Sequence, residues 1–248
     1  MVDAVKAVVL AAGKGTRLRT EGVDLPKVMR LAAGRPLLGY VLEALAFLPE
    51  KDIVLMAGYR REAVLAAYPA YPSAVQEPQL GTGHAVQCAK EALGDFSGSI
   101  LICYGDMPLM RRETYERLIE RHRAEGNDCT LLSVISQETL PYGRVVRDES
   151  GAFARIVEDK DCTPAERAIL ELNVGVYVFE STALWPALEQ LQPNNAQGEY
   201  YLTDAPAYIL AQGGRVGACP TCTAEEILGV NTIEQLEQVE EYVLRTGG

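Results

Sequence analysis

Hydrophobic and polar positions follow two alternating periods along the first half of the chain. Short, continuous apolar runs predict buried strands at 5–10, 53–57 and 100–104, with a brief strand at 74–76. Apolar positions at helical spacing predict helices between them, at 36–48, 62–68, 81–93 and 112–124. Strands that alternate with helices predict an α/β fold built on a doubly wound, mostly parallel, Rossmann-like sheet.

The rhythm changes after about residue 127. Strand patterns at 129–135, 143–147, 153–157 and 170–179 are separated by short turns, and the turn at 149–151 predicts a hairpin. Helical patterns return at 184–191, 200–212 and 232–244. We therefore expect an antiparallel addition to the parallel sheet in this half, within a chain that forms one domain.

The net charge excludes several classes of partner. Lysine and arginine number 23 against 34 acidic residues, which gives 23 − 34 = −11. An acidic chain is a poor match for nucleic acid or for an anionic membrane surface. The apolar run at the N-terminus is too short for a signal sequence, and no run is long enough to span a bilayer. We expect a cytoplasmic protein whose six cysteines are reduced.

Small residues and cations follow the first predicted strand. The run Leu10-Ala11-Ala12-Gly13-Lys14-Gly15-Thr16-Arg17 is followed by Leu25-Pro26-Lys27. Glycines let a tight turn present bare N–H groups to an anion, Arg17 can grip phosphate oxygens in pairs, and Lys27 supplies a point charge. The P-loop string is absent, and the dinucleotide fingerprint fails at Leu18. The pattern predicts a different kind of polyphosphate loop.

Two further segments lie at predicted strand or helix ends. Asp106 follows the strand at 100–104, so its carboxylate should face the same sheet edge as the glycine loop. An aspartate near a triphosphate typically holds Mg²⁺. Gln76 and Gln79 carry amides suited to the edge of a base, whereas we interpret His84 as a hydrogen-bonded structural residue. Cys219 and Cys222 lack a second cysteine pair and are interpreted as ordinary thiols.

These motifs, with several later ones, occur in the order of a known family. The chain resembles the uridylyltransferase half of bacterial bifunctional N-acetylglucosamine-1-phosphate uridyltransferases, most specifically in the run Asn194 to Asp204. The other matching segments are Tyr104-Gly105-Asp106-Met107-Pro108-Leu109, Tyr142-Gly143-Arg144, Ile156-Val157-Glu158, Glu171-Leu172-Asn173-Val174-Gly175 and Gly229-Val230-Asn231. The resemblance implies a nucleotide-binding half at about 1–126, a sugar-binding half at about 127–231 and a C-terminal helix at 232–248.

The resemblance also implies a reaction: UTP and N-acetylglucosamine 1-phosphate give UDP-N-acetylglucosamine, a peptidoglycan precursor, and pyrophosphate. It implies that Arg17 and Lys27 hold phosphates and that Asp106 and Asn231 bind Mg²⁺, the expected cofactor. The substrate-binding residues that it implies are Leu10, Ala11, Ala12, Gly13, Gln76, Gly81, Thr82, Tyr104, Gly105, Gly143, Glu158, Asn173, Glu199 and Tyr201. No protein nucleophile is needed, because a phosphate oxygen of the sugar is itself the attacking group.

Departures from the family pattern leave alternatives open. The loop between Arg17 and Lys27 is long, and Leu140-Pro141 replaces the Thr-Gly that usually precedes Tyr-Gly-Arg. The acceptor could therefore be glucose, N-acetylgalactosamine or N-acetylmuramic acid 1-phosphate, and a non-catalytic sensor of nucleotide sugars is a second class of function. Because the acetyltransferase half that builds the trimer is absent, we expect no acetyl transfer and a monomer or weak dimer.

Overall fold

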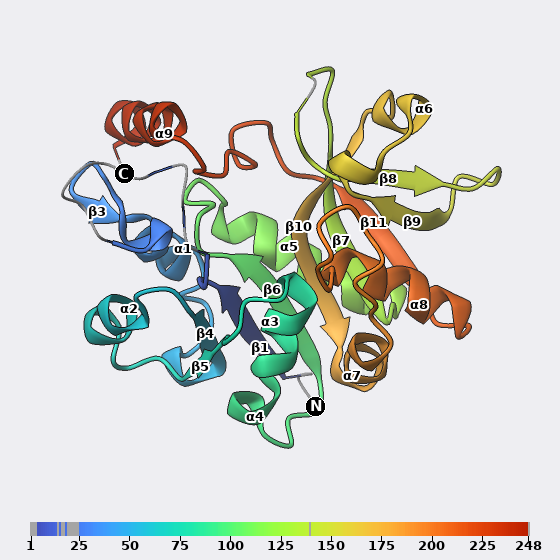
Figure 1. Ribbon diagram of the computed structural model, residues 1–248, viewed down its shortest axis with the longest axis horizontal. Helices are drawn as coiled ribbons and strands as arrows, with labels where there is room; N and C mark the ends of the chain where they lie inside the picture. The colour runs from blue at the N-terminus through green and yellow to red at the C-terminus, as the bar shows by residue number, and fades with distance from the viewer. Residues whose placement is uncertain (1–3, 14, 16–17, 19–24, 139, 248) are drawn as a thin grey trace.

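The computed structural model describes residues 4–13, 15, 18, 25–138 and 140–247. A twisted central sheet runs through the molecule and takes strands from both the N-terminal and C-terminal parts of the chain (Figure 1). Across the sheet the strand order is β11 (Val216–Pro220), β7 (Cys129–Ile135), β10 (Glu171–Glu180), β6 (Ser99–Tyr104), β1 (Val5–Leu10), β4 (Ile53–Ala57) and β5 (Ser73–Val75).

Strand direction confirms the predicted mostly parallel sheet with antiparallel additions. β1 pairs in parallel with β4 and β6, β4 pairs in parallel with β5, and β11 pairs in parallel with β7. β10 is antiparallel to both of its neighbours, β6 and β7. The parallel strands β1, β4, β5 and β6 therefore end at one common edge, which is where a doubly wound sheet binds ligands.

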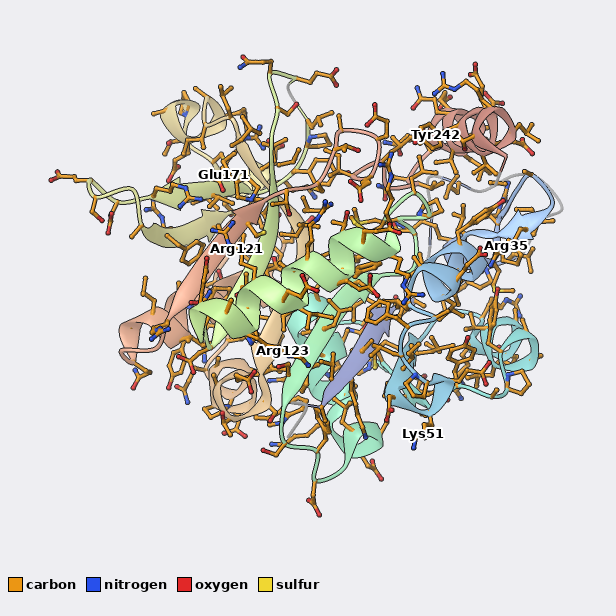
Figure 2. All side chains as sticks on the ribbon, turned by 180° about the vertical axis from the view of Figure 1, so that it is seen from behind. Arg35, Lys51, Arg121, Arg123, Glu171 and Tyr242 are labelled. Carbon is orange, nitrogen blue, oxygen red and sulfur yellow. The ribbon has the colours of Figure 1, made fainter. Side chains whose placement is uncertain are left out.

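A hairpin of β8 (Arg144–Arg147) and β9 (Phe153–Val157) extends from the start of β10. The ladder to β10 holds only one Cα pair, Leu172 with Arg144. A bidentate ion pair also joins the hairpin to β10, because Arg147 donates to both Glu171 carboxylate oxygens at 2.6 and 2.8 Å. Glu171 lies at the first residue of β10, beside the hairpin (Figure 2). The hairpin is therefore held against β10 by side-chain as well as backbone contacts.

Helices cover both faces of the sheet because successive residues of β1 point to opposite sides. Ala7 and Val9 belong to one buried cluster, and Val8 and Leu10 belong to the other. The first cluster includes residues of α1 (Leu37–Ala44), α2 (Arg61–Ala67) and α5 (Arg112–Glu125), of which α5 lies across the near face in Figure 2. The second includes residues of α3 (Thr82–Cys88), α4 (Lys90–Leu93), α7 (Ser181–Glu189) and α8 (Ala205–Ala211).

The remaining elements are short or peripheral. The C-terminal helix α9 (Ile233–Thr246) packs on a small third cluster that includes Ala32 and Leu37, next to the hairpin of β2 (Leu31–Ala32) and β3 (Arg35–Pro36). α6 (Pro164–Arg167) follows the β8–β9 hairpin and begins with a capping box formed by Thr163 and Glu166. Within the residues that the structure describes, no helix has the length and apolar character needed to cross a membrane.

Several helix bounds differ from the sequence prediction. The helix predicted at 36–48 ends at Ala44, and turns carry the chain from there toward Pro49. The helix predicted at 81–93 divides into α3 and α4 at Ala89. The helix predicted at 200–212 begins only at Ala205, because Pro206 lacks an N–H donor and fits the first helical turn. The strand β11 and the short elements β2, β3 and α6 were not predicted.

Candidate active site

The site forms where parallel strands end. Leu10 and Tyr104 are register partners at the ends of β1 and β6, and the Gly105 N–H donates to the Leu10 carbonyl at 3.0 Å. The glycine loop after β1 and the Gly105-Asp106 turn after β6 are therefore adjacent, as the sequence predicted. Gln76 directly follows β5 on the same edge.

A cavity of about 240 Å³ opens at this edge, and we call it the glycine-loop cavity. Ten residues predicted as site residues line it: Leu10, Ala12, Gly13, Lys27, Gln76, Gly81, Thr82, Tyr104, Asp106 and Glu199, together with Val28, Gln79 and Ala85. The predicted residues Ala11 and Gly105 do not line it, and the Ala11 N–H donates to the Met56 carbonyl at 2.9 Å. The cavity thus combines backbone at a strand end, two glutamine amides, a lysine and two carboxylates.

The segment that begins α3 is joined to the run 194–204. The Gly83 N–H donates to the Tyr200 carbonyl and the Tyr200 N–H to the Leu80 carbonyl, both at 2.8 Å. The hydroxyl of Thr82 accepts from the Leu202 N–H at 3.0 Å. Gly81 has φ +113°, and a Cβ there would lie 2.6 Å from the Tyr200 carbonyl oxygen, so only glycine permits this approach.

A second cavity of about 740 Å³, the Glu158 cavity, lies on the side of the C-terminal half. The predicted residues Glu158, Tyr201 and Asn231 line it, together with Pro141, Asp159, Lys160, Gln197, Thr232 and Gln235. Glu199 and Tyr201 were both predicted to bind substrate, and Glu199 lines the glycine-loop cavity whereas Tyr201 lines the Glu158 cavity. The two cavities are therefore lined by different parts of the same segment.

Lys27 joins the two cavities. Its ammonium group forms an ion pair with Asp106 Oδ2 and donates to Asn231 Oδ1 at 3.0 Å. Asp106 lines the glycine-loop cavity and Asn231 lines the Glu158 cavity. A backbone bond from the Val230 N–H to the Asp106 carbonyl, at 2.9 Å, holds the two segments together. The side-chain oxygens of Asp106 and Asn231 therefore converge on one point.

These two oxygens fit a magnesium ion. Mg²⁺ prefers hard oxygen ligands and commonly takes only one or two from protein, completing its shell with phosphate and water. Elsewhere among the described residues, no group of three or more histidine, cysteine, aspartate and glutamate side chains could hold a metal ion. The donor chemistry therefore matches a metal that arrives with a polyphosphate, rather than a closed structural site.

Carboxylates dominate the electrostatics of the Glu158 cavity. Burial raises the pKa of Glu158, and the nearby carboxylates of Asp204, Asp161 and Asp159 raise it further, while the Thr203 side chain opposes the change. Burial also raises the pKa of Tyr104, with additional effects from Glu158 and Asp106. Tyr104 lines the glycine-loop cavity, and both carboxylates act on its phenol.

Gly143 and Asn173 are placed by backbone bonds beside Glu158. The Gly143 carbonyl accepts from the Asn173 N–H at 2.8 Å, and a Cβ at Gly143 would lie 3.6 Å from Glu158 Oε2. The Asn173 side chain donates to the Tyr177 hydroxyl at 2.8 Å and accepts from the Gly175 N–H at 3.2 Å. Its orientation is therefore fixed from both ends, and each end keeps capacity for one further bond.

The structure places most predicted residues together and adds others. Arg17, predicted to hold phosphates, lies outside the described residues. The sequence reasoning missed Lys160, which lines the Glu158 cavity and bonds Gln197 across it. Its position two residues after Glu158 was the available signal. It also missed Arg144, whose fully buried guanidinium donates to the Tyr142 carbonyl.

The two cysteines near the C-terminus line neither cavity. Cys219 is buried in β11, and the Cys222 thiol donates to the Ser133 carbonyl at 3.3 Å. Both are free thiols, which agrees with their interpretation as ordinary cysteines. His84 bonds Gln76 and Cys88, so its interpretation as a hydrogen-bonded residue is also confirmed.

Comparison with known proteins identifies the family. A model of the MobA-like NTP transferase domain matches residues 7–207. The chain is 42% identical over 240 residues to the bifunctional protein GlmU of Pelotomaculum thermopropionicum, covering 96% of this chain and 52% of that protein. It is 41% identical over 247 residues to GlmU of Caldanaerobacter subterraneus subsp. tengcongensis, covering 98% and 52%. The chain spans about half the length of these curated relatives. The resemblance drawn from the motifs is thereby confirmed, and the chain belongs to the family of MobA-like NTP transferase domains.

Proposed function

We propose that this chain transfers the uridylyl group of UTP to N-acetylglucosamine 1-phosphate and releases pyrophosphate. The nucleotide is assigned to the glycine-loop cavity and the sugar to the Glu158 cavity. In this proposal the residues to about 126 bind the nucleotide and those from 127 to 231 bind the sugar phosphate. The helix α9 follows these two halves. Relatives named GlmU at about 40% identity support this reaction class.

The observation that carries the proposal is the contact of Lys27 with both Asp106 and Asn231. A cation at the junction of two cavities is what a reaction between two phosphate-bearing substrates requires, because the anions repel each other. Asp106 and Asn231 would hold Mg²⁺ at the same junction. When bound, the ion neutralises charge on the phosphates during transfer.

The chemistry needs no covalent enzyme intermediate. A phosphate oxygen of the sugar phosphate attacks the α-phosphorus of UTP in line, and a new P–O bond forms. The bond from the α-phosphorus to the bridging oxygen breaks, and its electron pair leaves with pyrophosphate. Lys27 offsets the charge that develops on the transferring group, and the glycine loop offers backbone N–H groups to the phosphates.

The residues of the Glu158 cavity favour a sugar rather than a second phosphate as the group that fills it. Glu158 and Asp159 line this cavity and would repel a phosphate, but their oxygens can accept hydrogen bonds from sugar hydroxyls. The acceptor phosphate would then point toward Asn231 and Lys27. This orientation brings the attacking oxygen to the junction where the α-phosphate must lie.

The choice of acceptor is tested by a pyrophosphate-release assay. UTP would be combined with the 1-phosphates of N-acetylglucosamine, glucose, N-acetylgalactosamine and N-acetylmuramic acid, and the first should give the highest kcat/KM. An equal or higher value for another sugar would replace the proposed acceptor. No pyrophosphate from any combination, at saturating UTP and Mg²⁺, would favour the non-catalytic sensor.

A further inference from the structure

The side-chain amide of Gln76 has a fixed orientation. Its nitrogen, Nε2, lies 2.8 Å from the Gly81 carbonyl oxygen and 3.3 Å from Nδ1 of His84. A carbonyl oxygen can only accept a hydrogen bond, so the atom facing Gly81 must be the amide nitrogen. An amide nitrogen can only donate, so Nδ1 of His84 must accept and therefore carries no proton.

The same reasoning fixes the tautomer of His84. With Nδ1 unprotonated, the ring proton of neutral His84 lies on Nε2, which is 3.6 Å from the Cys88 sulfur. Cys88 lies four residues after His84 on α3, so the helix holds the thiol beside the ring. The hydrogen-bonded series Cys88–His84–Gln76 therefore extends from α3 to the cavity wall, and each donor in it faces an acceptor.

The amide oxygen of Gln76 is left for a ligand. Gln76 Oε1 accepts no hydrogen bond from a described residue. It is not among the buried side-chain atoms that lack a partner in the described part of the chain, so it is exposed. Since Gln76 lines the glycine-loop cavity, this oxygen meets the open space of that cavity.

A fixed acceptor distinguishes pyrimidine bases. Uracil carries an N3–H donor between two carbonyl groups, whereas cytosine carries an unprotonated N3 that would oppose the lone pairs of Gln76 Oε1. We propose that His84 is a positioning residue, which locks the Gln76 amide with its oxygen toward the nucleobase and thereby sets a preference for uracil over cytosine. This inference rests on the proposed nucleotide transfer in the glycine-loop cavity.

The test compares two substitutions of His84. His84→Leu removes the acceptor, so the Gln76 amide can rotate and offer its nitrogen to the base. The ratio of kcat/KM for UTP to that for CTP should then fall at least about tenfold, mainly through a higher KM for UTP. His84→Asn can place its amide oxygen close to the position of Nδ1, and it should restore most of the ratio.

Gln87→Leu is the matched control on the same helix. It removes a hydrogen bond to the Leu188 carbonyl and lines neither cavity. It should reduce thermal stability and leave the UTP to CTP ratio unchanged. If His84→Leu behaves like Gln87→Leu, losing stability but keeping the ratio, His84 only packs the helix and the inference is overturned.

Nucleotide binding measured by calorimetry without an acceptor separates this inference from the proposed reaction. Preferential binding of UTP over CTP that weakens in His84→Leu supports the role of His84, even if no sugar phosphate is turned over. Equal binding of UTP and CTP by the unaltered protein overturns it, even if pyrophosphate is released.

Discussion

The phenol ring of Tyr104 packs directly on the backbone of Gly175. A Cβ built at Gly175 would lie 2.5 Å from Cε2 of Tyr104, closer than any real contact allows. Gly175 has φ +84° and lies where the pairing of β10 with β7 shifts register between Asn173 and Tyr177. This irregularity brings the strand against Tyr104, which lines the glycine-loop cavity.

Gly175→Ala should therefore damage both stability and activity. The new methyl group must displace the ring and adopt an unfavourable φ, so we expect a loss of about 2–5 kcal/mol in the free energy of unfolding. Gly151→Ala is the control, because Gly151 has φ +83° with no atom within 4 Å of a Cβ. It should cost about 1–2 kcal/mol. Urea denaturation measures the free energy of unfolding of the two variants, and equal losses would contradict the contact of Gly175 with Tyr104.

Asp106→Asn should abolish most turnover while leaving the fold intact. The substitution removes a negative charge from the point where Asp106 and Asn231 converge, so Mg²⁺ and Lys27 both lose a partner. We expect kcat to fall at least about 100-fold, as for other losses of charge stabilisation at a transferring group. Pyrophosphate release measures kcat, and circular dichroism checks the fold. A rate equal to that of the unaltered protein would remove Asp106 from the metal site.

Lys27→Met should separate metal binding from catalysis. The Lys27 ammonium contacts the same two oxygens that a dication would need, so the two cations compete for them. Without nucleotide, the variant should bind Mn²⁺ several-fold more tightly, as measured by electron paramagnetic resonance, while kcat falls about 100-fold or more. Lys160→Met is the control, because Lys160 lines the Glu158 cavity but contacts neither oxygen. Unchanged Mn²⁺ affinity in Lys27→Met would refute this competition.

Glu158→Gln should stabilise the fold at neutral pH while weakening sugar binding. Because burial raises the pKa of Glu158 above 4.5, the native state holds its proton more tightly than the unfolded state. Stability from this group is thus complete below pH 4.5 and is lost as pH rises through the native pKa. The variant should resist urea better than the unaltered protein at pH 8, and the difference should shrink toward pH 5.

The KM of Glu158→Gln for the sugar phosphate should rise about tenfold or more, because a charged acceptor is lost. Glu237→Gln, at an exposed position on α9, should change neither property. If the difference in urea resistance between Glu158→Gln and the unaltered protein stays constant from pH 5 to pH 8, burial of a charged carboxylate is not its cause.

The part of the site built from local sequence was predictable. The apolar runs that became β1 and β6 were continuous, and each is followed within three residues by a glycine. Parallel strands end at the same edge of a sheet, so the two runs predicted that Gly13 and Asp106 face one edge. The direct pairing of β1 with β6 comes from the structure. The tight turns at glycines were predictable for the same local reason.

Contacts between distant segments could not be derived from residue patterns. Lys27 and Asn231 are 204 positions apart, and the family resemblance gave them separate roles, in phosphate and in metal binding, without predicting their contact. The reversed direction of β10 depends on which neighbours it pairs with, which its apolar run does not specify. β11 was missed because its run is short, contains Gly217 and ends at Pro220, which are poor strand signals.

Arg144 should position the sugar side of the site without touching substrate. Its side chain is 1% exposed and donates to the carbonyls of Tyr142 and Arg167, and it pairs with Asp159 at 3.6 Å. It thus ties the segment before Gly143 to the segment after Glu158.

Arg144→Met would remove the bonds of a buried guanidinium to two carbonyls and its ion pair with Asp159, so we expect a loss of about 2–4 kcal/mol in stability. The KM for the sugar phosphate should rise at least about tenfold while the KM for UTP stays within about twofold, because the glycine-loop cavity does not depend on these bonds. Arg144→Lys supplies one compact donor group, so its KM for the sugar phosphate should lie between those of the unaltered protein and Arg144→Met. Arg155→Met, which removes only an exposed ion pair with Glu166, should alter neither constant. Equal increases in both KM values for Arg144→Met would show a general loss of structure instead, and would remove Arg144 from the sugar side.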